Sequence, residues 1–304
     1  MRLRLKIIFF ISVLFTSGLS CTAVHTEKWT LKTFPLKLEK ALKNVKTDGP
    51  AIVLKRSAIA GKTAVWAVDL NLLSRQKGRL MPTIKMSLNE QYELTSTEKA
   101  ESDGGVNAVL KIRNVKVNSK PPMPGVEKEA VKTLSGFKVS ANINARGKFT
   151  SLDPKNNTTK KVVKHVTNLL NLLDVLPDTP LRPGQDYKDT YMTHTRMVGG
   201  GVLNTKFRMK YTLKGVMPYK DGKVAVIHAV FNAKGTTDNA SKAESNVISE
   251  GNGSALILLS LVDGSVVKSE MHLSSLNRGN IKAKKDAYDF VQYFETHMIV
   301  NRKK

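Results

Sequence analysis

Cysteine is almost absent from this chain, because Cys21 is the only one among 304 residues. No disulfide can form within the chain, and metal sites built from several thiolates are excluded. The fold must therefore rest on its apolar core. Aromatic residues are also few, at 6% of the chain, and no basic run alternates with them as in proteins that stack the bases of single-stranded nucleic acid.

The first twenty residues contain no acidic side chain. Arg2, Arg4 and Lys6 precede a block over residues 7–15 that is apolar except for Ser12, which is the pattern of a secretory signal. This block falls well short of the ~20 residues that a helix needs to cross a bilayer core. The pattern therefore predicts a cleaved signal peptide over residues 1–20 in preference to a permanent transmembrane anchor.

Cys21 directly follows the predicted signal. Residues 17–21, with the sequence SGLSC, resemble the bacterial lipobox, whose cysteine is alkylated with diacylglycerol and becomes the acylated, for example palmitoylated, N-terminus. This resemblance implies lipidation at Cys21 and a lipidated tether over residues 21–50. The alternative is ordinary cleavage after Ser20, because Gly18 and Ser20 give the small-x-small pattern of that reaction. Thr22 in place of Asp resembles the enteric sorting signal for the outer membrane, so we expect a protein anchored by lipid in the cell envelope.

Acidic residues are outnumbered by basic ones, 25 to 49, which gives a formal net charge of +24. Removal of residues 1–20 leaves +21, because they carry three basic residues. Such a field attracts lipid headgroups, lipopolysaccharide phosphates or acidic glycans, and export argues against nucleic acid as a partner. The basic residues are spread along the chain, with modest clusters near residues 155–164, 282–285 and 302–304. That dispersion is more typical of a solvated surface than of a binding site.

Beyond residue 60, short alternating segments separated by Gly, Asn and Asp predict antiparallel β-structure. Paired landmarks recur at an offset of 117 to 119 residues, which predicts a duplicated β-unit with copies at about 60–155 and 185–300. We therefore expect a mainly β fold, a curved antiparallel sheet or half-barrel, in one domain over residues 51–304. The landmarks are Tyr92 with Tyr211, Asp103-Gly104 with Asp221-Gly222, Gly136 and Gly147 with Gly253 and Gly264, and Ser151 with Ser269.

One helix is predicted near residues 160–173, where six apolar residues recur at helical spacing. Either this helix packs on one face of the sheet as ordinary core, or it forms a lid over an apolar trough in a curved sheet. Both interpretations fit the pattern, since an apolar stripe does not reveal its partner. The six residues are Val162, Val163, Val166, Leu169, Leu170 and Leu173.

A stiff connector follows, because the prolines at 177, 180 and 183 exclude helix and central strand. Residues 176–187 resemble the Leu-Pro-x-x-Pro-x-x-x-Gly-x-x-aromatic linker of a family of uncharacterised bacterial exported proteins and lipoproteins, and the resemblance extends over about residues 60–275. It implies a signal and short strands, and it brings no catalytic residues. A helix on a curved antiparallel sheet is also similar to the lipoprotein-carrier folds that hold acyl chains in the envelope.

No motif for catalysis or for a cofactor is present. The nucleophile elbow Gly-x-Ser-x-Gly is absent, residues 199–206 lack the ending of a phosphate-binding loop, and residues 251–256 lack the third glycine of a dinucleotide site. Asp174, Asp178, Asp186 and Asp189 are close in sequence, but such groups usually solvate loops and cap turns. The histidines show no short metal-ligand spacing, so we expect no catalytic residue, no metal and no cofactor. They are His25, His165, His194, His228, His272 and His297.

These features favour a non-enzymatic envelope lipoprotein that binds or carries a hydrophobic or anionic envelope component. Its expected partners are the membrane, through the N-terminal lipid, and a lipid or anionic glycan. The first alternative is a surface adhesin for acidic glycans or host matrix, which requires only a basic face. The second is an enzyme of unknown type, which requires a cleft with a histidine beside a carboxylate or serine. The sequence does not determine the oligomeric state.

Overall fold

The structure is a computed structural model that describes residues 29–42, 45–57, 63–78, 81–101, 105–147, 149–154, 176–177, 179–196, 202–220, 222–238, 245–283 and 286–303. The predicted signal peptide, Cys21 and the predicted helix over residues 160–173 lie outside the described residues.

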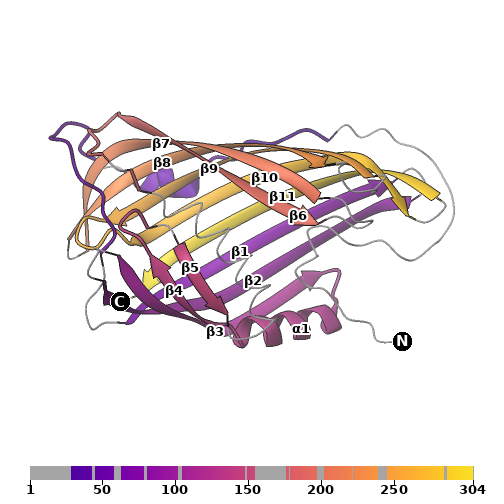
Figure 1. The fold of residues 1–304 in the computed structure, drawn as a ribbon, viewed down its shortest axis with the longest axis horizontal. Coiled ribbons are helices and arrows are strands. Elements are labelled where there is room, and N and C mark those ends of the chain that lie inside the picture. Colours follow the sequence, from indigo (N-terminus) through magenta and orange to yellow (C-terminus); the bar gives the residue numbers. More distant parts are fainter. Residues whose placement is uncertain are drawn as a thin grey trace.

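Eleven strands form one antiparallel sheet, so the predicted mainly β fold with a curved antiparallel sheet is confirmed (Figure 1). The strands reach twenty residues, which is longer than the short segments expected from the sequence, and β1 shows the expected alternation of buried and less buried positions. Their bounds are β1 Thr63–Gly78, β2 Met81–Ala100, β3 Val106–Lys120, β4 Lys138–Ile143, β5 Phe149–Pro154, β6 Asp186–Arg196, β7 Val202–Tyr219, β8 Gly222–Asp238, β9 Ser245–Ser260, β10 Val266–Ala283 and β11 Asp286–Lys303.

The strand order consists of two meanders joined in the middle of the sheet. Strands β1 to β5 follow one another outward from the centre to one edge, and β11 back to β6 do the same to the other. The first and last strands, β1 and β11, pair antiparallel and join the two meanders. The edges are β5 and β6, which are consecutive in the sequence, so the chain between them must pass from one edge of the sheet to the other.

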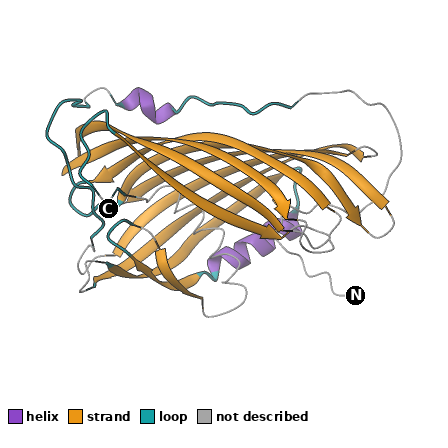
Figure 2. Ribbon diagram, turned by 45° about the horizontal axis from the view of Figure 1, so that its top comes forward, coloured by secondary structure: helices purple, strands orange, loops and turns teal. Residues whose placement is uncertain are grey.

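Two helical elements are described, and both lie outside the predicted helix over residues 160–173. Helix α1 (Pro124–Ser135) packs on β3 through the buried residues Ala130 and Leu134. The short 3-10 helix η2 (Lys37–Ala41) lies on the outer side of the sheet, where Figure 2 shows it above the strands. Within the part of the chain that the structure describes, no helix has the length and apolarity to span a bilayer.

The sheet curves into a trough (Figure 2), and its concave face carries the main core. Alternate residues of each strand, such as Trp66 and Leu70 on β1, point into this core, which extends from β1 to β4 and from β7 to β11. The outer face has a smaller core beneath η2, where Leu36 and Leu38 pack on β8 and β9. This part of the predicted tether therefore lies against the sheet.

A glycine on the concave face permits the close approach of two strands. A Cβ added to Gly253 of β9 would lie against the carbonyl oxygen of His272 on β10, closer than real Cβ atoms come. Glycine in a strand interior often marks such an approach of another backbone. Gly253 therefore allows β9 and β10 to coil tightly where the trough is formed.

Some of the paired sequence landmarks occupy corresponding places in the two meanders, whereas Gly136 follows α1 and Gly253 lies within β9. Tyr92 lies on β2 and Tyr211 on β7, and each strand leads through a hairpin into the next. Gly147 and Gly264 follow β4 and β9 and have positive φ values of 79° and 65°. The duplication of the β-unit stays a prediction from the sequence.

Candidate functional site

The centre of the concave face holds large apolar side chains that are only partly buried. Leu72 and Leu88 are opposite each other on β1 and β2, and Leu273 and Phe294 lie on β10 and β11. All four are intermediate in burial. We call these four residues the central patch.

Small side chains adjoin the central patch, and fully buried apolar side chains lie on one side of it. Thr296 lies between Leu72 and Leu273 across three neighbouring strands, and Ser275 is opposite Phe294. On the side toward the start of β1, Leu70, Met271 and Met298 are fully or almost fully buried. The trough is therefore filled by its own side chains at that end and partly open at the patch. This contrast locates a surface where an apolar molecule could be held.

A carboxyl group is buried beside the central patch. Glu90 of β2 is 7% exposed, and the strand register places it opposite Leu70 on one side and Val117 on the other. Burial in this apolar setting raises the pKa of Glu90 from 4.5 to about 7. Burial also raises the pKa of Tyr92, and the charge of Glu90 adds to that rise. Glu90 is thus uncharged in mildly acidic solution.

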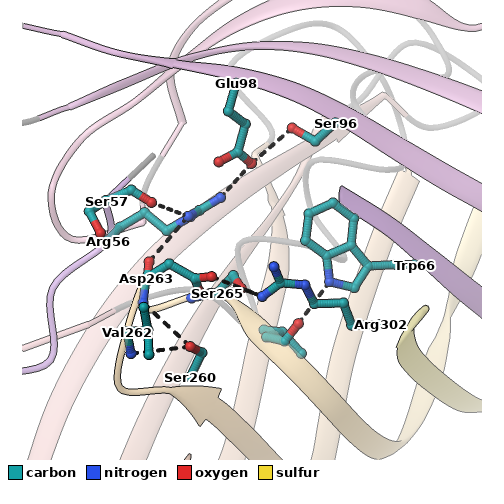
Figure 3. Close-up of polar contacts among 11 residues, drawn as sticks. Arg56, Ser57, Trp66, Ser96, Glu98, Ser260, Val262, Asp263, Ser265 and Arg302 are labelled. Carbon is teal, nitrogen blue, oxygen red and sulfur yellow. Dashed lines mark hydrogen bonds and ion pairs between the residues drawn. The ribbon is translucent and has the colours of Figure 1, made fainter. Parts of the chain in front are cut away.

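A network of mostly buried polar groups lies at the end of the concave face where β1 begins (Figure 3). Arg56 is 6% exposed, and its guanidinium donates to the Glu98 carboxylate at 2.5 Å. Ser96 donates to the same carboxylate oxygen at 2.9 Å. A second guanidinium, that of Arg302, donates to Asp263 at 2.9 Å. We call this set the end network.

The carboxylate of Asp263 is fixed within the end network. Its burial alone would raise its pKa, but hydrogen bonds from Ser265 and the guanidinium of Arg302 outweigh burial and lower that pKa. Ser265 donates both its backbone N–H and its hydroxyl to Asp263, at 2.8 and 2.6 Å. The indole of Trp66 donates to the neighbouring carbonyl of Val266 at 2.7 Å. Each carboxylate of the end network is therefore paired with a guanidinium, which indicates a structural role.

The segment over residues 52–57 ties the two meanders together at this end. The N–H of Arg56 donates to the carbonyl of Ala145, in the turn after β4. The next N–H, of Ser57, donates to the carbonyl of Asp263, in the turn after β9. These two turns hold Gly147 and Gly264, so one short segment bridges corresponding turns of the proposed duplicate units.

The outer face holds a cluster that sequence spacing did not reveal. His272 of β10 and His297 of β11 are directly opposite in the register, and their rings stack with centroids 3.9 Å apart. The Glu270 carboxylate lies beside them, with one oxygen 3.1 Å from Nε2 of His297 and 3.5 Å from Nε2 of His272. We call these three residues the His–Glu cluster. The signal that could have found it is the pairing of β10 with β11, which brings together residues 25 apart.

The electrostatics of the His–Glu cluster follow from burial and close contacts. Burial opposes ionisation of Glu270, but hydrogen bonds from the backbone of Leu38 and Lys37 and from His297 lower its pKa. Burial and then the charge of His297 lower the pKa of His272. The second alternative from the sequence, an enzyme of unknown type, requires a cleft that holds a histidine beside a carboxylate or serine. His272 lies beside the Glu270 carboxylate and meets the second part of this requirement.

The other residues that the sequence analysis named as possible site residues either lie apart from the His–Glu cluster or lie outside the described residues. His194, on β6, contacts the side-chain oxygen of Asn204 at 2.6 Å, and His228 lies on β8. Asp186, at the start of β6, forms an ion pair with Lys210 at 2.8 Å. Outside the described residues are His25, His165, Asp174, Asp178 and the glycines at 199–201.

Comparison with known proteins assigns no family. No protein-family model matches the chain, and no curated protein matches it. Among solved structures, a LolA superfamily protein from Nitrosomonas europaea aligns with 78% of this chain and 87% of its own, at 10% identity and a TM-score of 0.14. An overlap this slight carries no conclusion about function.

Proposed function

We propose that this chain is a lipid-anchored protein of the cell envelope that has no catalytic role and holds a hydrophobic envelope component against the concave face of its sheet. The observation that carries this proposal is the central patch, where Leu72, Leu88, Leu273 and Phe294 remain partly accessible beside the buried core of the concave face. Partly exposed apolar side chains gathered on a concave surface are typical of sites for apolar ligands.

Acyl chains are the component that best suits this surface. The patch offers apolar side chains from four adjacent strands, β2, β1, β11 and β10, and they form a strip across the sheet in which Thr296 lies between Leu72 and Leu273. A chain of methylene groups laid along such a strip is stabilised by roughly 0.8 kcal/mol for each CH₂ that it buries. The surplus of basic residues would favour an anionic headgroup outside the trough.

A fluorescent fatty acid, cis-parinaric acid, tests the proposal in titrations of the purified protein. The Ser275→Trp variant fills the space opposite Phe294 and should weaken binding at least tenfold. The matched control is Ile248→Trp, which places the same bulk on the outer face of β9, where Ile248 is 55% exposed. We expect this control to bind within twofold of the unmodified protein.

Circular dichroism and the urea midpoint of both variants establish that each is folded. Absence of saturable binding to the unmodified protein would overturn the proposal. Equal loss of binding in both tryptophan variants would also overturn it, because the ligand would then not lie in the trough.

A further inference from the structure

The outer face of β10 is covered by the N-terminal segment over residues 29–38, which runs along the strand. Backbone carbonyls of Trp29 and Lys32 accept hydrogen bonds from Arg278 and Ser274, at 3.5 and 2.9 Å. Further along, the ring of Phe34 stacks on His272, with centroids 5.2 Å apart. The His–Glu cluster therefore lies beneath this segment on the side of the sheet away from the trough.

We propose that the His–Glu cluster, Glu270, His272 and His297, is a binding site for a divalent transition metal ion such as Zn²⁺. The three side chains each offer one ligand atom, and these atoms all lie within 4.8 Å of one another. Two imidazoles and one carboxylate form a recognised set of zinc ligands, which leaves a fourth position for water or another ligand. This inference is independent of the function proposed for the concave face.

The distances between the ligand atoms are close to those of a coordination sphere. Two ligands about 2.05 Å from one ion at a tetrahedral angle are roughly 3.3 Å apart. The distances from the Glu270 oxygen to Nε2 of His297 and of His272 are 3.1 and 3.5 Å. The two rings stack within 14° of parallel, so an ion between them requires the rings to rotate and direct both Nε2 atoms toward it.

The carboxylate is already held in place by the backbone. Its other oxygen accepts the N–H of Leu38 at 2.6 Å, and the oxygen that faces the histidines, now in contact with Nε2 of His297, is the one that an ion would bind. Such supporting contacts orient metal ligands and raise affinity. The side chains of His272 and His297 are 16% and 22% exposed, so an ion can reach them from solvent. Imidazole and carboxylate donors suit Zn²⁺, Cu²⁺ or Ni²⁺. The cluster contains no thiolate, so it is not a site for metal ions that require sulfur ligands.

A purely structural role for the cluster makes a different prediction. In that case the histidines only stabilise the Glu270 carboxylate, which in turn fixes η2 through Leu38, and no ion is bound. Isothermal titration of the metal-free protein with ZnCl₂ in a buffer that does not chelate metals distinguishes the two.

We expect one equivalent of Zn²⁺ to bind and to raise the urea midpoint. His272→Gln and His297→Gln should each lower the affinity at least tenfold and abolish that rise. The matched control is His194→Gln, on β6, which should bind Zn²⁺ as the unmodified protein does. With Cu²⁺, the electron paramagnetic resonance spectrum should show two imidazole nitrogens. Absence of stoichiometric binding, or binding that persists unchanged in His272→Gln, would overturn the assignment.

Discussion

The guanidinium of Arg56 lies 2.5 Å from the carboxylate of Glu98, and both side chains are almost completely withdrawn from water. Arg56 precedes the first strand, whereas Glu98 lies near the end of β2. The pair therefore holds the segment over residues 52–57 against the concave face near the end of β2. Two buried opposite charges stabilise a fold only as long as both are present.

Loss of one partner of this pair should destabilise the protein strongly. Arg56→Met leaves the Glu98 carboxylate buried without its cation, and we expect the free energy of unfolding to fall by roughly 3–5 kcal/mol. The double variant with Arg56→Met and Glu98→Leu should recover most of this loss. Urea unfolding measures both. If the double variant were as unstable as the single one, the pairing would not be the source of the effect.

An exposed ion pair provides the control for this prediction. Lys303 contacts Glu93 at the surface, so Lys303→Met should leave the urea midpoint nearly unchanged.

Burial of Glu90 predicts a loss of stability as the pH rises. Its pKa in the folded protein, about 7, is above its ordinary value of 4.5, so the folded state holds the proton more tightly than the unfolded state. This contribution to stability is complete below pH 4.5 and is lost as the pH rises through 7, to an extent on the order of 3 kcal/mol.

Glu90→Gln should remove that pH dependence. The variant and the unmodified protein should differ little at pH 4.5, and the variant should be the more stable at pH 8. Urea midpoints over this range check the difference. A constant difference between the two proteins at all pH values would contradict the assigned pKa.

Gly253 should not tolerate a side chain. Gly253→Ala places a Cβ against the backbone of His272 and Leu273, which forces β9 and β10 apart, and we expect a loss of roughly 1–3 kcal/mol. The matched control is Gly125→Ala in the first turn of α1, where the added Cβ meets nothing within 4 Å. That change should stabilise the protein by roughly 0.5–1 kcal/mol, since alanine favours a helix. Thermal unfolding measures both, and a stabilised Gly253→Ala would contradict the account of the curvature.

The alternation of apolar residues predicted strands, because each strand buries one side on the concave core. Trp66, Val68 and Leu70 show this period of two. Helix α1 was missed, since its sequence is largely polar and only Ala130 and Leu134 are fully buried. Its position depends on packing against β3, which no local pattern of α1 reveals.

The candidate sites depend on strand register, which local sequence does not specify. A shift of one residue between β10 and β11 would move His297 to the other face of the sheet, away from His272. The Arg56 and Glu98 pair joins residues 42 apart, and Arg56 reaches Asp263 across 207 residues. Histidine spacing along the chain therefore gave no indication of the cluster.

The most direct test of the central claim is mass spectrometry of the intact protein purified from its native membrane in mild detergent, with organic extraction of what accompanies it. The account predicts a protein that lacks residues 1–20, carries a diacylglyceryl mass on Cys21 and holds a stoichiometric amount of an acyl-chain lipid. The extracted lipid should displace cis-parinaric acid from the purified protein. A protein with an unmodified Cys21 would contradict the proposed anchor, and a lipidated protein with nothing bound would contradict the proposed role of the concave face.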